Sequence, residues 1–287
     1  MTQQTALGVM DTTRDTPRIP PTPRRTRVIR VEHIMGLPIG VDVRAPAVDP
    51  AALDAAFAWL RWVDATFNTY RPDSAINRLN RRELAVEEVP PQVGAVLARG
   101  RALTRETDGY FDMRVAVGPH DRRDDAILAC GAVDPSGLVK GWAVDRAAEI
   151  LEAAGARAYN INAGGDVLVR GGAAPGAAWR IGIQHPLRRD KVAAVLAATD
   201  LAVATSGAYE RGAHIVDPHT GRPPTGVLSV TVAGPELAAA DAYATAAYAM
   251  GQAGPAWTAG LAGRGYEALT ILVDGTVRTT PGFSLAR

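Results

Sequence analysis

The chain has 287 residues, of which 47% are hydrophobic, so it can bury a full core as one large domain or two closely packed lobes. Its 31 Lys and Arg residues nearly balance its 30 Asp and Glu residues, which excludes a global positive field that would attract nucleic acid or an acidic membrane surface. The single cysteine, Cys130, excludes an intramolecular disulfide.

The N-terminal segment mixes Thr, Pro and Arg without an apolar run of the length that a secretory signal needs. We therefore predict a flexible leader at residues 1–27 and one domain over residues 28–287. No later segment approaches the roughly twenty consecutive apolar residues of a membrane-spanning helix. The sequence accordingly predicts a cytoplasmic protein without a membrane or nucleic-acid partner.

Two strands and three helices are predicted in the first half of the chain. Residues 28–43 are rich in β-branched side chains and break at Met35-Gly36-Leu37-Pro38, which predicts two short strands around a bend. Apolar residues at helical spacing predict one helix that begins at Asp49-Pro50 and another from about Pro91 to Thr107. A third helix is predicted to follow Lys140 and to end at Gly155.

From Tyr159 onward the pattern changes to short β segments that are separated by turn residues. The predicted strands are 159–162, 167–170, 179–184, 192–198, 201–204 and 228–233. The turn Gly164-Gly165 is either a simple hairpin or a place where a ligand meets bare backbone. An alanine-rich helix from about Pro235 to Gly251, a short helix near 255–263 and a final hairpin complete the chain. The whole pattern predicts an α+β fold with an antiparallel sheet.

The segment from Thr205 to Pro218 is the most reactive part of the chain. It is predicted to be a loop and contains two hydroxyls, several glycines, His214 and a carboxylate. On the helix that follows, Asp241 and Thr245 are four residues apart and therefore share one face. A carboxylate and a hydroxyl are hard oxygen ligands of the kind that Mg²⁺ prefers. We therefore predict a magnesium site at these two residues.

A second polar stretch runs from Asp134 through Gly137 and Lys140 to Asp145. Backbone amides and a lysine at a helix start favour a phosphate group. The order Lys140-Gly141 is the reverse of the Walker pattern, which excludes a P-loop NTPase. From these residues alone, an ordinary helix start with an exposed lysine explains the stretch equally well.

Several short motifs occur together along the chain in one order. They are Met35-Gly36, Thr69-Tyr70 with Ser74 and Asn80, Gly109-Tyr110-Phe111-Asp112, Asp134 with Lys140-Gly141 and Asp145, Asn162-Ala163-Gly164-Gly165-Asp166, Thr205-Ser206-Gly207 with His214 and Asp217-Pro218, and Asp241 with Thr245. Each motif is weak alone, but their joint order is specific, and together they resemble the ApbE family, the FAD:protein FMN transferases. The resemblance covers nearly the whole chain from about Val28. The resemblance implies one bilobed α+β domain, with antiparallel sheets and packed helices, that binds FAD between its lobes.

The resemblance also implies a reaction and roles for particular residues. Members of the family cleave FAD with Mg²⁺, transfer the FMN half to a Ser or Thr hydroxyl of an acceptor flavoprotein and release AMP. By resemblance, His214 matches the catalytic base, and Asp241, Thr245 and the Gly137 carbonyl match the metal site, with the Ala244 carbonyl as a further candidate. The positions that match FAD contacts are Met35, Tyr70, Tyr110, Phe111, Asp112, Asp134, Lys140 and Ile215.

The chemistry of these residue types agrees with that reaction. The FAD pyrophosphate carries two negative charges that repel an incoming oxygen, so Mg²⁺ and a cation such as Lys140 would offset them. His214 is suited to accept the hydroxyl proton because imidazole titrates near neutral pH, and Asp217 is a candidate to orient it. Tyr70 could stack on an aromatic ring, although a buried tyrosine with a satisfied hydroxyl is the commoner outcome.

The sequence departs from the family pattern between Asp112 and Asp134. This interval is shorter than the family's and includes the polar run 119–125, so we expect a more open FAD pocket or weaker docking of the acceptor. Two other functions stay open. A FAD pyrophosphatase would use water in place of the acceptor hydroxyl, and a flavin-binding module would leave FAD intact. A zinc hydrolase is disfavoured because the five histidines lack any recognised metal-binding spacing.

Overall fold

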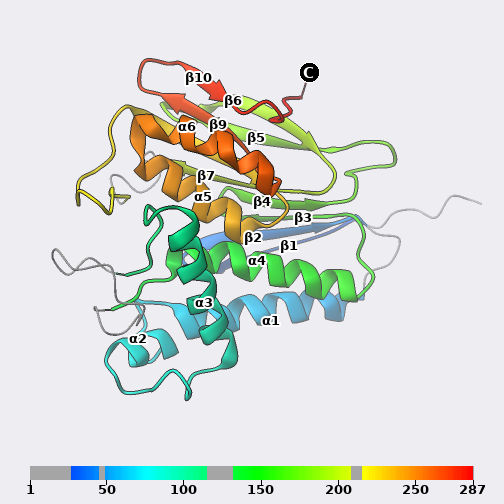
Figure 1. Cartoon of the computed structure of the whole chain (residues 1–287). Helices are drawn as coiled ribbons and strands as arrows, with labels where there is room; N and C mark the ends of the chain where they lie inside the picture. Colours follow the sequence, from blue (N-terminus) through cyan, green and yellow to red (C-terminus); the bar gives the residue numbers. More distant parts are fainter. Residues whose placement is uncertain (1–26, 45–48, 115–131, 208–214, 287) are drawn as a thin grey trace, which may run out of the picture.

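The computed structural model describes residues 27–44, 49–114, 132–207 and 215–286 (Figure 1). The helices in these ranges are α1 (Pro50–Phe67), α2 (Ala75–Asn80), α3 (Pro91–Glu106), α4 (Ser136–Ala153), α5 (Leu237–Ala249) and α6 (Gly254–Thr258), with the 3-10 helices η1 (Gly251–Ala253) and η2 (Ala259–Arg264). The strands are β1 (Val28–Ile34), β2 (Leu37–Val43), β3 (Tyr159–Ala163), β4 (Asp166–Arg170), β5 (Trp179–His185), β6 (Arg188–Ala198), β7 (Leu201–Gly207), β8 (Val227–Gly234), β9 (Glu267–Leu272) and β10 (Val277–Thr279). Among the helices of the described ranges, none combines the length and the apolar character that crossing a membrane requires.

Eight strands form one sheet in the order β1-β2-β3-β4-β7-β8-β9-β10, and each neighbouring pair is antiparallel. The pairing of β2 with β3 places α1 to α4 within a single connection. The β3–β4 turn is a two-residue hairpin in which Gly164 and Gly165 have positive φ angles of 61° and 100°, which side chains other than glycine disfavour. The predicted α+β fold with antiparallel sheets is confirmed.

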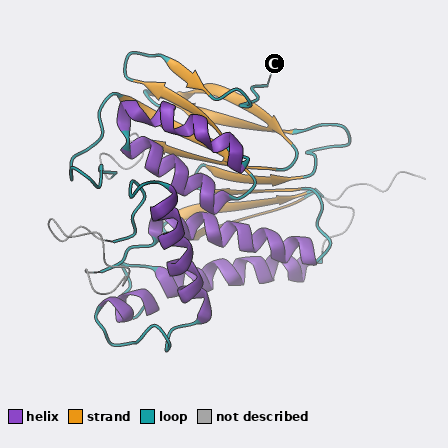
Figure 2. Ribbon diagram, in the orientation of Figure 1, coloured by secondary structure: helices purple, strands orange, loops and turns teal. Residues whose placement is uncertain are grey.

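The helices gather on one face of this sheet (Figure 2). α5 packs on β7 and β8, α4 packs against α5, and α1 packs against α4. Every residue of α5 except Thr245 is buried, because short alanine side chains allow the helix to lie close to the sheet and to α4. Large apolar side chains such as Phe57, Leu60 and Leu151 fill the remaining space. This first core positions the polar residues of α4 and α5.

The β5–β6 hairpin packs on the opposite face of the sheet, over β4, β7, β8 and β9. Val167 and Val169 of β4 pack with Trp179 and Ile181 of β5 in a second hydrophobic core. Leu168, which lies between the two valines, belongs to the first core because successive side chains of a strand point to opposite faces. β4 is therefore buried on both faces.

The predicted start of α1 is confirmed. The Asp49 carboxylate accepts the Ala51 N–H at 2.9 Å, and Pro50 occupies the first helical position. α2 begins in a similar way, since the Ser74 hydroxyl accepts the Asn77 N–H at 3.3 Å. Each helix start depends on residues close together in sequence, which explains why the sequence locates the start of α1.

Two strand boundaries differ from the prediction by more than one residue. β6 begins at Arg188 and not at Val192, because Arg188 pairs with β5 across the hairpin. β7 continues beyond Ala204 to Gly207, because residues 205–207 pair with residues 229–231 of β8. The first part of the predicted loop that starts at Thr205 is therefore a strand. This places Ser206 on a rigid element beside α5.

Candidate functional site

Three charged side chains from α4, β4 and α5 meet in the first core. The Lys140 ammonium forms an ion pair with the Asp166 carboxylate and lies 3.4 Å from Asp241 Oδ2. The two carboxylate side chains are only 4% and 8% exposed. Two negative charges and one positive charge give this cluster a net negative charge in surroundings that screen it poorly. We call Lys140, Asp166 and Asp241 the charged triad.

The lysine of the charged triad stays protonated. Burial alone would lower the pKa of Lys140, but the charges of Asp166 and Asp241 outweigh burial and hold the pKa well above its usual value. The ammonium is therefore a fixed cation at neutral pH. It offsets only part of the negative charge, which leaves the triad able to accept another cation.

Replacement of the lysine is expected to make protein stability depend on Mg²⁺. Lys140→Met leaves two buried carboxylates without their cation, which should lower the free energy of unfolding by about 3–5 kcal/mol. Added Mg²⁺ should raise the melting temperature of this variant more than that of the wild type, because it can replace the missing charge. Thermal unfolding with and without Mg²⁺ measures both effects.

The matched control for that experiment is Lys191→Met. Lys191 is exposed and lies 3.6 Å from the exposed Asp190, so its loss should change stability little. A Lys140→Met protein as stable as the control, with no response to Mg²⁺, would contradict the assigned balance of charges.

Asp166 is positioned by the β3–β4 hairpin. The Asn162 side chain accepts the Gly165 N–H at 3.0 Å inside the turn, and β4 begins at the next residue. One oxygen of Asp166 accepts the Thr205 N–H at 3.0 Å, and the other binds Lys140. Both carboxylate oxygens are thus engaged and their orientation is fixed. The sequence contains Asp166 in a motif but does not reveal its pairing with Lys140.

Asp241 and Thr245 lie on α5, as the sequence predicts. The Thr245 hydroxyl lies 3.2 Å from the Ser206 hydroxyl of β7. The neighbouring Thr205 hydroxyl lies 2.9 Å from that of Thr231 on β8. Ser206 therefore adds a second hydroxyl to the surroundings of Thr245, a contact that depends on the unpredicted extension of β7.

The donor atoms at this place fit Mg²⁺, which prefers carboxylate, hydroxyl and carbonyl oxygens. Gly137 precedes Lys140 by three residues on α4 and therefore lies on the same side of that helix. Over the described ranges, His, Cys, Asp and Glu form no group of three or more that could hold a metal. Mg²⁺ commonly takes few protein ligands and completes its coordination shell with water or substrate phosphate.

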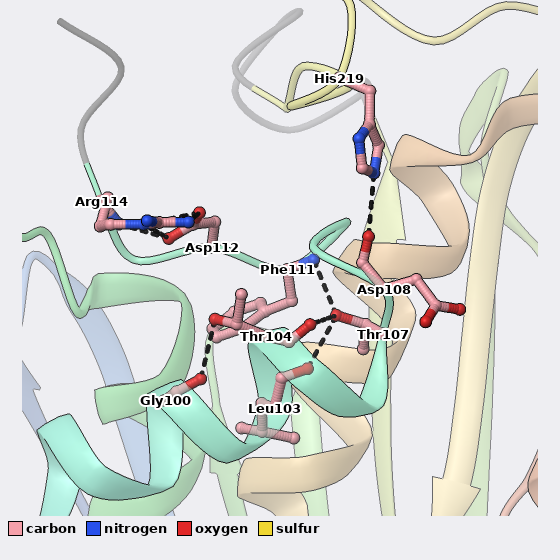
Figure 3. A network of polar contacts seen from close by, with 9 residues as sticks. All are labelled: Gly100, Leu103, Thr104, Thr107, Asp108, Phe111, Asp112, Arg114 and His219. Carbon is pink, nitrogen blue, oxygen red and sulfur yellow. Dashed lines mark hydrogen bonds and ion pairs between the residues drawn. The ribbon is translucent and has the colours of Figure 1, made fainter. Parts of the chain in front are cut away.

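The predicted flavin-contact residues Tyr110, Phe111 and Asp112 lie on the turn that follows α3. Figure 3 shows Phe111 and Asp112 there. The buried Thr107 hydroxyl donates to the Leu103 carbonyl at 2.8 Å and accepts the Phe111 N–H at 3.0 Å. Because one hydroxyl binds both the helix end and the turn, the turn is fixed relative to α3.

The remaining contacts of this turn concern Asp112 and Asp134. Arg114 binds the Asp112 carboxylate, with Nη2 at 2.5 Å from Oδ2. The Asp134 N–H donates to the Met113 carbonyl at 2.7 Å, and the Asp134 carboxylate accepts the Ser136 N–H at 3.0 Å at the start of α4. The structure therefore brings Asp134 next to the turn. Residues 115–131, which make up most of the shortened interval, lie outside the described residues.

His219 connects the turn to the segment that follows residue 214 (Figure 3). Its Nε2 lies 3.0 Å from the Asp108 carbonyl, and its ring meets the Tyr110 ring edge-on with centroids 4.5 Å apart. The Asp217 carboxylate accepts the His219 N–H at 2.8 Å and also binds Thr220. The described contacts of Asp217 are those of a turn. The sequence does not single out His219, although its position just after Asp217-Pro218 is a usable signal.

Two more predicted flavin contacts, Met35 and Ile215, are half-buried and pack against the first core, as Tyr110 does. Met35 has a positive φ of 56° in the turn between β1 and β2. The predicted base, His214, lies outside the described residues, which resume at Ile215.

Tyr70 differs from the commoner expectation for a tyrosine, because it is 93% exposed. Its loop is nevertheless ordered by side chains. The Asn77 amide donates to the carbonyls of Thr69 and Arg71, each at 2.8 Å, and the Asn68 side chain accepts the Tyr70 N–H at 2.8 Å. A rigid loop thus presents this aromatic ring to solvent.

Comparison with known proteins adds a second line of observation. A family profile described as the ApbE family matches residues 35–122 and 124–269. An FAD:protein FMN transferase of Vibrio cholerae is 30% identical over 238 residues, which covers 67% of this chain and 71% of the relative. An FAD:protein FMN transferase of Rhodobacter capsulatus is 34% identical over 240 residues, which covers 68% of this chain and 45% of the relative.

Solved structures agree with the sequence relatives. The crystal structure of an ApbE protein from Thermotoga maritima superposes with a TM-score of 0.77 at 25% identity, covering 90% of this chain and 98% of that one. The flavin transferase ApbE from Vibrio cholerae superposes with a TM-score of 0.75 at 26% identity and with the same coverage. Because the family match extends over most of the residues that build the sheet, the helices and the charged triad, this chain belongs to the ApbE family.

Proposed function

We propose that this protein is a flavin transferase that moves FMN from FAD to a Ser or Thr hydroxyl of an acceptor flavoprotein, in the presence of Mg²⁺, and releases AMP. The observation that carries the proposal is the buried Asp241 carboxylate, 3.4 Å from Lys140 and one helical turn from Thr245, in a member of the ApbE family. The relatives from Vibrio cholerae and Rhodobacter capsulatus are named FAD:protein FMN transferases.

In the proposed reaction, the oxygen of the acceptor hydroxyl forms a bond to the phosphorus of the FMN half. The bond between that phosphorus and the bridging oxygen of the pyrophosphate breaks, and AMP leaves with the bridging oxygen. The hydroxyl proton passes to a base, for which we propose His214. No oxidant or reductant takes part, because the flavin ring is carried through unchanged.

We propose that Asp241, Thr245 and the Gly137 carbonyl hold Mg²⁺, with the Ala244 carbonyl as a further candidate. When bound, the ion would neutralise charge on the pyrophosphate. Lys140 adds a second cation that the triad keeps protonated and oriented. A positive group fixed in place before the reaction stabilises developing charge without reorganisation, which is the main source of catalysis in sites of this type.

We propose that FAD contacts Lys140 and the group Met35, Tyr70, Tyr110, Phe111, Asp112, Asp134 and Ile215. The exposed Tyr70 ring is suited to stack on a flat aromatic ligand, because side-chain hydrogen bonds already order its loop. Tyr110 and Phe111 lie on the turn that Thr107 fixes. Rigid aromatic side chains lose little entropy on binding, which favours tight capture of a flavin.

The proposal is tested by incubating the full chain with FAD, Mg²⁺ and candidate acceptor flavoproteins. Intact-protein mass spectrometry should show that the acceptor gains the mass of one FMN less one water, with one AMP released per modified acceptor. An acceptor whose target Ser or Thr is replaced by Ala is the control. Free FMN and AMP with an unmodified acceptor would instead identify a FAD pyrophosphatase, and intact FAD would identify a binding module.

A further inference from the structure

α5 begins without a capping side chain of its own. The first N–H groups of an α-helix have no partner within the helix. Glu236 occupies the N-cap position and makes no capping hydrogen bond. Instead, Asp145 of α4 accepts the Leu237 N–H with one carboxylate oxygen and the Ala238 N–H with the other, each at 2.8 Å. The cap of α5 therefore comes from a different helix.

Gly141, one turn before Asp145 on α4, allows the two helices to come this close. A Cβ atom at Gly141 would lie 2.7 Å from the Leu237 carbonyl oxygen and 2.8 Å from Ala238 Cα. These are backbone atoms of the same two residues that bind Asp145. One stretch of α4 thus fixes the start of α5 both by close packing and by hydrogen bonds.

This contact lies beside the candidate site on both helices. Lys140 directly precedes Gly141, and Asp241 follows Leu237 by four residues, which is about one helical turn. A displacement of α5 relative to α4 therefore changes the 3.4 Å separation of Lys140 Nζ and Asp241 Oδ2. It also moves Thr245, which lies further along the same helix.

We infer that Gly141 and Asp145 together fix the position of α5 relative to α4. Asp145 is then a positioning residue for the proposed Mg²⁺ ligands Asp241 and Thr245. The inference rests on the proposed function for the identity of the ion. Asp145 itself binds backbone amides, so it acts on the ion only through α5. Groups that orient metal ligands in this way affect metal affinity by about 10- to 100-fold when removed.

The first test compares Asp145→Ala with Asp49→Ala, since each variant removes the carboxylate cap of one helix. Calorimetric titration of the flavin-free full chain with Mg²⁺ should give a dissociation constant about 10- to 100-fold higher for Asp145→Ala. Asp49→Ala should lower the melting temperature but leave the dissociation constant at the wild-type value, because α1 carries no proposed ligand. Asp145→Asn keeps one acceptor oxygen and should fall between wild type and Asp145→Ala.

The second test compares Gly141→Ala with Gly94→Ala. A Cβ atom at Gly94 in α3 meets nothing within 4 Å, so that variant should bind Mg²⁺ as the wild type does. Gly141→Ala should weaken Mg²⁺ binding although alanine is the better helix former, because the methyl group displaces α5.

The inference is overturned if Asp145→Ala and Asp49→Ala change the dissociation constant equally, or if neither changes it. Hydrogen exchange offers a readout without the ion, since the Leu237 and Ala238 amides should exchange faster in Asp145→Ala than in Asp49→Ala. Equal exchange would also overturn it. FMN transfer by the wild type, measured in parallel, decides the proposed function separately.

Discussion

Asp241→Asn is expected to slow Mg²⁺-dependent FMN transfer by about 10²–10³-fold while the protein stays folded. The amide is a weaker ligand for a hard cation than the carboxylate. The fold should survive because Lys140 remains paired with Asp166, so the substitution changes the triad from a net negative charge to neutral. AMP release and acceptor mass, measured over a range of Mg²⁺ concentrations, give the rate. Circular dichroism and thermal unfolding check the fold.

The matched control for Asp241→Asn is Asp200→Asn. The Asp200 carboxylate accepts the Gly171 N–H at 3.1 Å and has no place in the charged triad. This variant should transfer FMN at the wild-type rate. If Asp241→Asn transfers FMN at the wild-type rate at limiting Mg²⁺, Asp241 is not a metal ligand, and the proposed function loses the observation that carries it.

His214→Ala is expected to slow FMN transfer by about 10²–10⁴-fold, the usual contribution of a positioned general base. The affinity for FAD should change little, because the proposed flavin contacts are other residues. Protonation of an imidazole base slows the reaction at acidic pH. This decrease in rate should be absent in His214→Ala. Single-turnover rates across pH and a separate measurement of FAD binding distinguish these effects.

His219→Ala is the matched control, since it removes a second imidazole from the same part of the chain. His219 contacts Asp108 and Tyr110, so its loss should raise the KM for FAD more than it lowers kcat. If His214→Ala and His219→Ala give the same kinetic pattern, neither imidazole is the specific base. Unchanged transfer by His214→Ala would exclude His214 from the role.

The parts of the fold that the sequence predicts well are those with local signals. Asp49-Pro50 starts α1 and Gly164-Gly165 forms a hairpin, because each depends only on adjacent residues. The ends of β6 and β7 are different, since they depend on how far the partner strands β5 and β8 run. A local sequence pattern does not show how far the partner strand extends. This is the reason why Ser206 reads as a loop residue in the sequence.

The candidate site, like the fold, is predictable from the sequence only where the signal is local. The spacing of Asp241 and Thr245 reports a shared helix face, and the structure places both on α5. The pairing of Lys140 with Asp166 has no such signal, because it depends on where α4 crosses the β3–β4 hairpin. The cap that Asp145 gives α5 joins residues 92 and 93 positions apart. For Tyr70, burial is the commoner outcome, yet the Asn68 side chain accepts the Tyr70 N–H and the Asn77 amide donates to the Thr69 carbonyl, which orders an exposed loop.

Because β2 pairs with β3, two strands that are neighbours in the sheet are separated by residues 44–158 in the chain. Contacts between residues so distant in sequence form slowly, since a long stretch must lose its freedom before they are made. During synthesis on the ribosome, Lys140 emerges well before Asp241. The Asp145 carboxylate of α4 can bind the Leu237 and Ala238 amides only after α5 has been synthesised. Nascent chains that stop before Leu237 therefore lack a complete charged triad. Binding of Mg²⁺ at the proposed ligands Asp241 and Thr245 is therefore expected only after α5 has been synthesised.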